Sequence, residues 1–239
     1  NGNWYKGNLH SHTTVSDGKM TPEQSVEVYK EHGYNFLALS EHDIYTDYRK
    51  QYNTDNFIMI PAIEASAILY QEEGSSKRLE IHHLHGILGT SEMQKNAKAP
   101  LFTHMEHVPP QKHYGTWRGR EISQEIADML RDRGCVVTYN HPIWSRVTEE
   151  EFIYTEGVQA LEIFNYNTVL ESNTGYDVTY WDRMLRMGKK INGFASDDNH
   201  NEGLFEDSCG GWICVQAPEL THDAIIQNFL DGNYYSSAG

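Results

Sequence analysis

The chain of 239 residues is poor in cysteine and in basic residues, and it has no long apolar segment. Three cysteines, none of them in a Cys-x-x-Cys pair, exclude a disulfide framework and a thiolate metal site of that spacing. The 19 Lys and Arg against 34 Asp and Glu give a net charge of −15, so we expect no duplex nucleic acid as a partner. The longest apolar run, around residues 57–63, contains a proline and is far shorter than the roughly 18 residues of a membrane-spanning helix, so no membrane span is expected.

The two ends of the sequence carry few signals. The first residue is Asn1, and the chain has neither an initiator methionine nor a signal-peptide pattern. We expect a trimmed product that is truncated at its C-terminus, so that further domains can follow. Compartment and oligomeric state stay open.

Histidine is the residue that the chain has in excess. There are 13 histidines, and several of them stand beside aspartate or glutamate. Imidazole and carboxylate groups together are the ligands of borderline and hard metal ions. The composition therefore favours a metal-binding globular protein.

Apolar strand-like runs alternate with helical patterns along almost the whole chain. The expected strands are 9–13, 36–40, 57–62, 80–88, 135–139, 160–165, 191–196 and 212–215. The expected helices are 22–32, 121–132, 176–187 and 221–231. This alternation predicts one α/β domain with a mainly parallel sheet, either closed as a barrel or doubly wound. The irregular stretch 90–119, which contains three prolines, is expected to be a lid-like insert.

The first expected strand carries a metal-binding pattern, His10-Ser11-His12. Residues two apart on a strand share a face, so the two imidazoles are expected to point the same way. Asp17 follows in the loop after the strand, where α/β folds build their sites.

Later strands deliver residues of the same types. These are Glu41-His42-Asp43, Glu64, His82, His83, His85, Asn140-His141 and Asp197-Asp198-Asn199-His200. Burying so many polar groups without partners would cost free energy at each of several strands. One convergent polynuclear metal site explains all of them.

In this order along the chain, the motifs resemble those of the PHP superfamily, the polymerase-and-histidinol-phosphatase metal-dependent phosphoesterases. The matching residues are His10-x-His12, Ser16-Asp17-Gly18, Ser40-Glu41-His42-Asp43, Ile63-Glu64, His83-x-x-Gly86, Asn140-His141-Pro142 and Asp198-x-His200. The resemblance runs from residue 10 to residue 200, with a family-like ending at 211–239. It implies a distorted (β/α)7 barrel whose metal site lies at the carboxyl ends of the strands.

The resemblance also implies how the ligands share two or three divalent ions. One ion would be held by His10, His12, Glu64 and Asp198. Glu64 would bridge to a second ion, completed by His83 and His141, and a third would be held by Asp17, His42 and His200.

Some choices within this set depend on spacing alone. His85 is a rival of His83, and Asp197 is a rival of Asp198, but only His83 and Asp198 fit the spacing of the family. His82 is expected to point away from the site. Some members of the superfamily have histidine where this chain has Asp17. The carboxylate of Asp17 makes the third metal position better suited to hard cations.

Such a site is expected to hydrolyse a small phosphomonoester or a phosphodiester such as a nucleotide. Two ions about 4 Å apart bind phosphoryl oxygens and generate hydroxide near neutral pH. The ions are expected to be Zn, Mn or Fe, and the expected catalytic residues are Glu64, Asp198 and His200. Residues expected to hold the ligand imidazoles in one tautomer are Glu41, Asp43, Asn140 and Asp197.

A phosphorylated substrate also needs a cationic partner. Arg146 follows an expected ligand by five positions and is the first candidate, with Arg118 and His113 from the insert as further ones. Trp117 and Trp144 could stack a base or a sugar, although aromatic residues near a barrel rim are as often packing.

Two other functions remain open at this point. Similar barrels also support metal-assisted hydrolysis of C–N bonds and carboxylic esters, although no lysine stands where an amidohydrolase carbamate bridge would need it. A non-catalytic PHP module of a larger protein is the second alternative, and retention of all the expected ligands argues against it.

Overall fold

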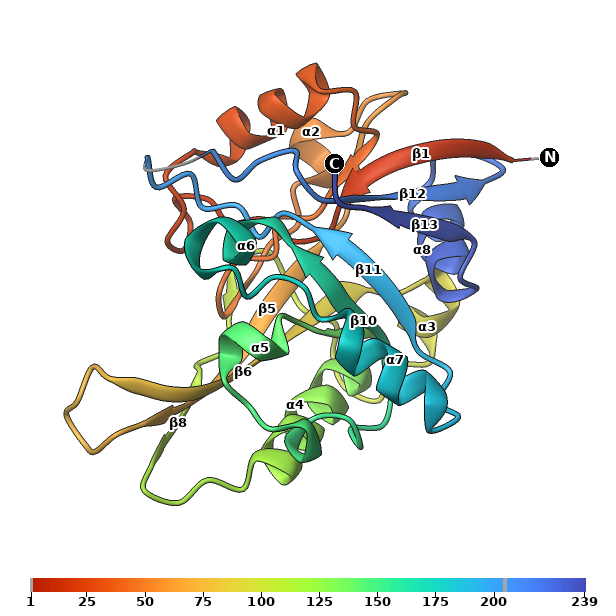
Figure 1. The fold of residues 1–239 in the computed structure, drawn as a ribbon. Helices are drawn as coiled ribbons and strands as arrows, with labels where there is room; N and C mark the ends of the chain where they lie inside the picture. Colours follow the sequence, from red (N-terminus) through yellow and green to blue (C-terminus); the bar gives the residue numbers. More distant parts are fainter. Residues whose placement is uncertain (1, 204–205) are drawn as a thin grey trace.

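The computed structural model describes residues 2–203 and 206–239, which fold into three β-sheets with helices around them (Figure 1). The five-stranded sheet has the order β13-β12-β1-β2-β4. Its strands are β1 (Asn3–Asn8), β2 (Phe36–Leu37), β4 (Ile58–Met59), β12 (Trp212–Ala217) and β13 (Tyr234–Ser237).

The six-stranded sheet has the order β11-β10-β9-β6-β5-β8. Its strands are β5 (Ala62–Tyr70), β6 (Arg78–Leu88), β8 (Gln111–Tyr114), β9 (Cys135–Tyr139), β10 (Val158–Asn165) and β11 (Asn192–Ser196). A small third sheet pairs β3 (Ile44–Tyr45) with β7 (Glu106–His107). The hairpin of β5 and β6, with β8 beside it, projects from the body at the lower left of Figure 1.

The helices connect and cover these sheets. They are α1 (Pro22–Glu31), α2 (Arg49–Tyr52), α3 (Ser91–Lys95), α4 (Gly119–Asp132), α5 (Pro142–Ser145), α6 (Tyr166–Ser172), α7 (Val178–Arg186) and α8 (His222–Leu230), with a 3₁₀ turn at Glu149–Glu151. Helix α1 begins with a capping box between Thr21 and Gln24, and Pro22 occupies its first turn. In the part of the chain that is described, no helix is both long and apolar enough to cross a membrane.

The mixed α/β class is confirmed, but the closed (β/α)7 barrel is not found in residues 2–203 and 206–239. Each large sheet is open, with β13 and β4 at the edges of one and β11 and β8 at the edges of the other. The strands β1, β2 and β4 are parallel, and so are β9, β10 and β11. Strand β6, however, is antiparallel to both of its neighbours, β9 and β5, and the short connection 71–77 joins it to β5 as a hairpin.

The expected strand at residues 9–13 is wrong, because β1 already ends at Asn8. The side chain of Asn8 turns back on the next residues: its amide donates to the carbonyl of His10 at 2.9 Å and its oxygen accepts from the His10 N–H at 3.2 Å. Such local side-chain bonds compete with a sheet ladder. Residues 10–12 are instead held by residues 198–199, since His12 N donates to Asn199 O and Asp198 N donates to His10 O.

Strand β5 was not expected, because the apolar run was taken to end at residue 62. All but two of its nine residues are buried, which places Glu64 inside a central strand instead of in a loop. The stretch 90–119 is also not free of structure, since it contains α3, β7 and β8. Three apolar clusters stabilise the sheets. Helix α4 packs in the first, α8 in the second, and α1 in the third, through Val26 and Tyr29.

Candidate metal centre

Three overlapping groups of metal-ligating side chains lie together, some beyond the ends of β1, β2 and β11 and two, Glu64 and His83, within β5 and β6. The ligand atoms within each group lie within 4.8 Å of one another. The groups are His10-His12-Glu64-Asp198, His42-Glu64-His83 and His12-Asp17-His42-His200. They bring together eight of the nine residues that the sequence pattern singles out, and His141 adjoins them.

All four residues of the first group are buried. His10 Nε2 lies 3.1 Å from Glu64 Oε1 and 3.0 Å from Asp198 Oδ1. His12 Nε2 lies 2.9 Å from the same Asp198 oxygen and 3.2 Å from Glu64 Oε2. Four of these atoms, His10 Nε2, His12 Nε2, Glu64 Oε2 and Asp198 Oδ1, are buried and make no hydrogen bond in the described structure. Buried polar atoms that converge without partners fit a bound cation.

The second group shares Glu64 with the first. Oε1 of Glu64 lies 3.4 Å from His83 Nδ1 and 3.4 Å from His141 Nε2, and these two imidazole nitrogens are 3.3 Å apart. His42 Nδ1 lies 3.2 Å from the other Glu64 oxygen. The two carboxylate oxygens of Glu64 therefore face different sets of imidazoles.

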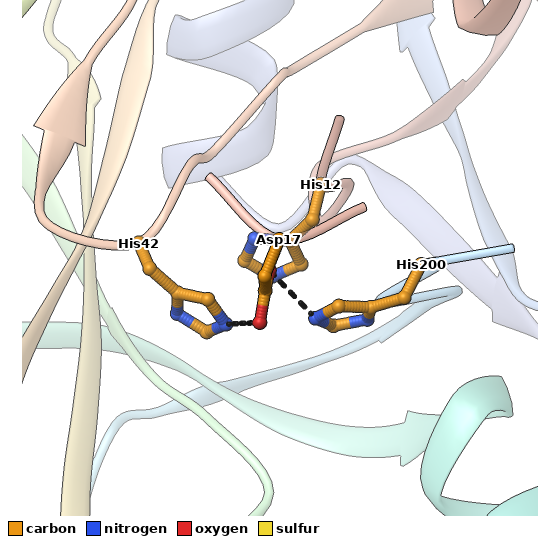
Figure 2. A group of neighbouring side chains, drawn as sticks. All are labelled: His12, Asp17, His42 and His200. Atoms are coloured by element: carbon orange, nitrogen blue, oxygen red, sulfur yellow. Dashed lines mark ion pairs between the residues drawn. The ribbon is translucent and has the colours of Figure 1, made fainter. Parts of the chain in front are cut away.

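The third group is more open and appears in Figure 2. Asp17 lies 3.4 Å from His42 Nε2 and 3.3 Å from His200 Nε2. The ring of His12 stacks between them, with its centroid 4.1 Å from that of His42 and 4.3 Å from that of His200. About half of the Asp17 side chain is exposed, so this group faces solvent.

The carboxylates of the centre raise the pKa of some of its imidazoles, whereas burial holds the pKa of His83 well below its usual range. Burial alone would lower the pKa of His10, but the negative charges of Asp198 and Glu64 raise it well above its usual range. Burial also lowers the pKa of His200, but its hydrogen bond to Asp17 and the charge of Asp198 raise it by more. The result is a pKa of about 9. Burial opposes ionisation of Glu64, yet the adjacent His10 and His83 hold its pKa well below its usual range. Positive charge beside these buried carboxylates therefore favours their ionised form, and metal ions would supply such charge.

Glu162 of β10 orients His10, and sequence reasoning missed it. One of its oxygens accepts a hydrogen bond from His10 Nδ1 at 2.7 Å, which turns Nε2 toward Glu64 and Asp198. Its other oxygen accepts from the backbone N–H of His141 at 3.0 Å. The available signal was a lone charged residue in a buried apolar strand, which needs a polar partner.

The four residues that were expected to hold ligand imidazoles form hydrogen bonds to other groups instead. Glu41 accepts from the backbone N–H groups of Thr13 at 2.9 Å and Ser16 at 3.1 Å and from both hydroxyls, so it fixes the loop before Asp17. Asn140 donates to Glu64 Oε1 at 2.9 Å and so holds that carboxylate.

Asp43 and Asp197 also bind backbone instead of imidazole. Asp43 accepts from the N–H of Ser66 at 2.9 Å, and burial raises its pKa to about 6. Asp197 accepts from Tyr29 at 2.5 Å and from the backbone N–H groups of residues 209–211, which fixes the loop that carries Asp198. The partners of ring nitrogens are Glu162 for His10, Ser145 for His141 and the carbonyl of Asp198 for His200.

The two spare histidines of β6 are both buried and differ in role. His82 points away from the centre, as expected, with Nδ1 2.5 Å from the Tyr139 hydroxyl and Nε2 2.8 Å from the carbonyl of Gly119. His85 lies opposite Glu64 in the ladder and packs edge-on against His10 at 4.3 Å. It is in none of the three ligand groups.

A pocket of about 500 Å³ opens over the centre. It is lined by Asp17, His42, Asp43, Ser66, Ile68, Arg78, His83, His141, Trp144, Asn167, Thr168, Glu171, Asp198, His200 and Glu202. Trp144, one of the two aromatic candidates for stacking, is in this wall, and its indole N–H donates to Glu171 at 2.9 Å.

The three expected substrate-binding residues do not line this pocket. Arg146 turns outward in a left-handed conformation and donates to the carbonyl of Arg78 at 2.7 Å. Arg118 pairs with Glu121 at 3.0 Å on the surface of α4, and His113 sits on β8 beside Gln111. The arginine that does line the pocket is Arg78, which the sequence did not single out.

Comparison with known proteins shows which solved structures have a similar fold. No family model and no curated protein matches the sequence. Among solved structures, a two-domain protein from Bacteroides vulgatus, named as containing a predicted PHP-like metal-dependent phosphoesterase, is similar with a TM-score of 0.57 at 15% identity. The match covers 98% of this chain and 65% of that one, so the chain spans about two thirds of that protein.

Two further structures match over nearly their whole length. A protein from Bifidobacterium adolescentis, named as a metal-dependent phosphoesterase, has a TM-score of 0.52 at 14% identity, with 95% of this chain and 96% of that one covered. The chain has the fold of the PHP-like proteins. An amidohydrolase from Chromobacterium violaceum, with bound sulfate and no metal, has a TM-score of 0.54 at 12% identity, with 96% and 97% covered. At these identities the likeness concerns the PHP-like fold, and it confirms the resemblance at that level.

Proposed function

We propose that this chain is a metal-dependent hydrolase of phosphate esters, acting on a small phosphomonoester or phosphodiester. The observation that carries the proposal is the set of four buried ligand atoms, from His10, His12, Glu64 and Asp198, that converge without hydrogen-bond partners beneath an open pocket. Two of the three similar structures are named as metal-dependent phosphoesterases. The donor set and the fold thus support the same chemistry.

The residues present fit two or three divalent ions. His10, His12, Glu64 and Asp198 would hold one, Glu64 with His83 and His141 a second, and Asp17, His42 and His200 a third. Mixed imidazole and carboxylate ligands suit Zn, Mn or Fe. When bound, such ions supply positive charge to the phosphoryl oxygens and lower the pKa of a water molecule.

The chain's own residues position this chemistry. Oε1 of Glu64 faces His10, His83 and His141, and Oε2 faces His12 and His42, so this carboxylate would contribute to holding more than one ion. Asn140 fixes one Glu64 oxygen, and Glu162 fixes the ring of His10, so the ligands are oriented before substrate arrives. His10, His12 and Glu64 are fully buried and exclude solvent from one side, while Asp17, Asp198 and His200 face the pocket from the other.

Hydrolysis of amides or carboxylic esters is the second candidate, because one similar structure is named an amidohydrolase. No lysine lines the pocket in the described chain, and the carboxylate shared by two of the ligand groups is Glu64. The phosphate ester is therefore preferred.

The test is a substrate screen on protein loaded separately with Zn, Mn and Fe(II). Phosphomonoesters, phosphodiesters, amides and lactones are compared, with and without a chelator. We expect phosphate-ester turnover that the chelator abolishes and that Asp198→Asn reduces at least about a thousandfold with the fold intact. Turnover of amides or lactones alone would reject the phosphoesterase proposal. The matched control is Asp223→Asn, an exposed carboxylate at the start of α8.

A further inference from the structure

Arg78 lies at the first position of β6, and it is the only lysine or arginine among the described residues that line the pocket over the ligand groups. Its backbone is fixed from two sides. It pairs with Tyr70 across the β5–β6 hairpin, and its carbonyl accepts the guanidinium of Arg146 at 2.7 Å. The base of this side chain is therefore held against the pocket wall.

The guanidinium of Arg78 has no acidic partner within 4.0 Å in the described chain. Six other arginines each pair with an aspartate or glutamate, namely Arg49, Arg118, Arg131, Arg133, Arg183 and Arg186. Arg120 and Arg146 also lack an acidic partner in the described chain, but Arg120 lies over the ring of Tyr154 and Arg146 donates to the Arg78 carbonyl. An unpaired guanidinium retains all of its donors for a planar anion. In an acid-rich pocket, such a group is suited to a ligand.

Arg78 and the ligand groups share one aromatic wall. The Arg78 guanidinium carbon lies 6.0 Å from the centre of the Trp144 ring. The imidazoles of His83 and His141 lie against the same indole, with centroids 5.9 Å and 4.9 Å away. The bond from Trp144 to Glu171 holds the indole in place. A substrate with its phosphoryl group at the ligand groups could thus extend along Trp144 to Arg78.

The neighbouring polar groups of this wall are already engaged. Glu171 accepts from Trp144, Asn167 donates to Asp207 at 2.7 Å, and Asp43 accepts from Ser66. Arg78 also lies beyond ion-pair distance of Asp17, Glu64 and Asp198, so it is separate from the carboxylates that would hold the ions.

We infer that Arg78 is a specificity-determining residue, which binds a second anionic group carried by the leaving-group side of the substrate. This rests on the proposed phosphoesterase function and names its substrate class: a phosphate ester whose leaving group bears a carboxylate or a second phosphate. The ring of Trp144 supports the part of the substrate between the two anions. The reacting phosphoryl group itself binds at the ligand groups and does not depend on Arg78.

The test uses phenyl phosphate, its 3- and 4-carboxyl derivatives, and 1,3- and 1,4-phenylene bisphosphate, with the metal-loaded full chain and phosphate release as the readout. We expect Arg78→Met to raise KM for the carboxyl or bisphosphate compounds about ten- to a hundredfold, and to change phenyl phosphate less than about twofold. Differences in leaving-group reactivity cancel, because each substrate is compared between the two proteins. The carboxyl and bisphosphate arms show which anion is preferred.

Two further variants sharpen the result. Arg78→Lys keeps the charge and should recover part of the preference, and Arg186→Met, which removes an exposed guanidinium of α7, should change no KM. An equal loss on all substrates would place Arg78 on the reacting phosphoryl group and overturn the inference. No loss on any substrate would overturn it as well.

A binding measurement separates this inference from the proposed function. Calorimetry with benzylphosphonate and with 4-carboxybenzylphosphonate, which are not phosphate esters, needs no turnover. Preference for the carboxyl compound that disappears in Arg78→Met, without turnover of any ester by the wild type, would keep the anion site and reject the phosphoesterase. Ester turnover by the wild type, without a binding preference for the carboxyl compound, would keep the phosphoesterase and reject the anion site at Arg78.

Discussion

Glu162 accepts a hydrogen bond from Nδ1 of His10 at 2.7 Å, and neither residue has any exposed surface. The bond leaves Nε2 of His10 as the only free ring nitrogen, facing Glu64 and Asp198. A carboxylate behind a ligand histidine fixes the ring and strengthens it as a donor to metal. Glu162 therefore links the buried strand β10 to the metal centre.

Glu162→Gln should weaken metal binding about ten- to a hundredfold, because the amide still fills the space but no longer offers two acceptor oxygens. Competition with a chelating dye gives the affinity for each metal. At saturating metal, turnover should recover most of its wild-type value. Glu121→Gln, an exposed residue of α4, is the control, and equal affinities in the two variants would refute the orienting role.

The ligand residues could be found from the sequence because each belongs to a short motif beside a strand. His10-x-His12, Ser40-Glu41-His42-Asp43 and Asp198-x-His200 carry their chemistry within a few residues, so spacing is informative. Glu162 has no such neighbour, and only its place in a buried strand marks it. The mixed α/β class likewise followed from alternating apolar runs, whereas closure of a barrel depends on strand pairing that no local pattern encodes.

Arg78 could not be found for a related reason. It reaches the pocket because β5 and β6 form a long antiparallel hairpin, and β5 was not expected. Its run Ala62–Tyr70 contains Glu64 and Ser66, which break the apolar pattern, yet both are buried, Glu64 among the ligand groups and Ser66 in the pocket wall. Arg146, by contrast, was expected from its distance to His141 along the chain, but the left-handed turn at Arg146 directs it outward.

Asp17→Asn should reduce the number of bound ions by one. Asp17 is the only carboxylate of its ligand group, and without it three imidazoles remain. Because its side chain is about half exposed, the substitution should leave the fold unchanged. Metal content is measured by elemental analysis after gel filtration, with Asp55→Asn on an exposed loop as the control. An unchanged metal content would argue against a third position.

Gly7→Ala should destabilise the chain by about 1–3 kcal/mol or more. A Cβ at this position would lie 2.0 Å from the ring of Phe36, which is fully buried opposite Gly7 in the β1–β2 pair. Urea unfolding measures the loss. The double variant Gly7→Ala/Phe36→Leu should recover part of it, because the smaller side chain leaves room; no recovery would contradict the steric cause.

Asp177 has a buried carboxyl group whose ionisation lowers the free energy of unfolding as the pH rises. One of its oxygens accepts from the N–H of Ile143 at 3.1 Å, and the other has no partner in the described structure. Burial raises its pKa from 3.8 to about 7. Between pH 4 and pH 7 the folded protein keeps a proton that the unfolded chain has released, so the contribution of this group to stability falls as the pH rises through that range.

Asp177→Asn removes this pH dependence, since its oxygen can still accept from Ile143 but the side chain cannot ionise. Relative to the wild type, the variant should gain stability from pH 4 to pH 7, by up to about 4 kcal/mol, and the difference should be constant above that. The measurement is the free energy of unfolding in urea at pH 5 and pH 8 for both proteins, because a difference between variants cancels the titration of the histidines. Asp182→Asn, on the exposed face of α7, should show no such gain. If the two variants behave alike, the buried charge of Asp177 is not the cause.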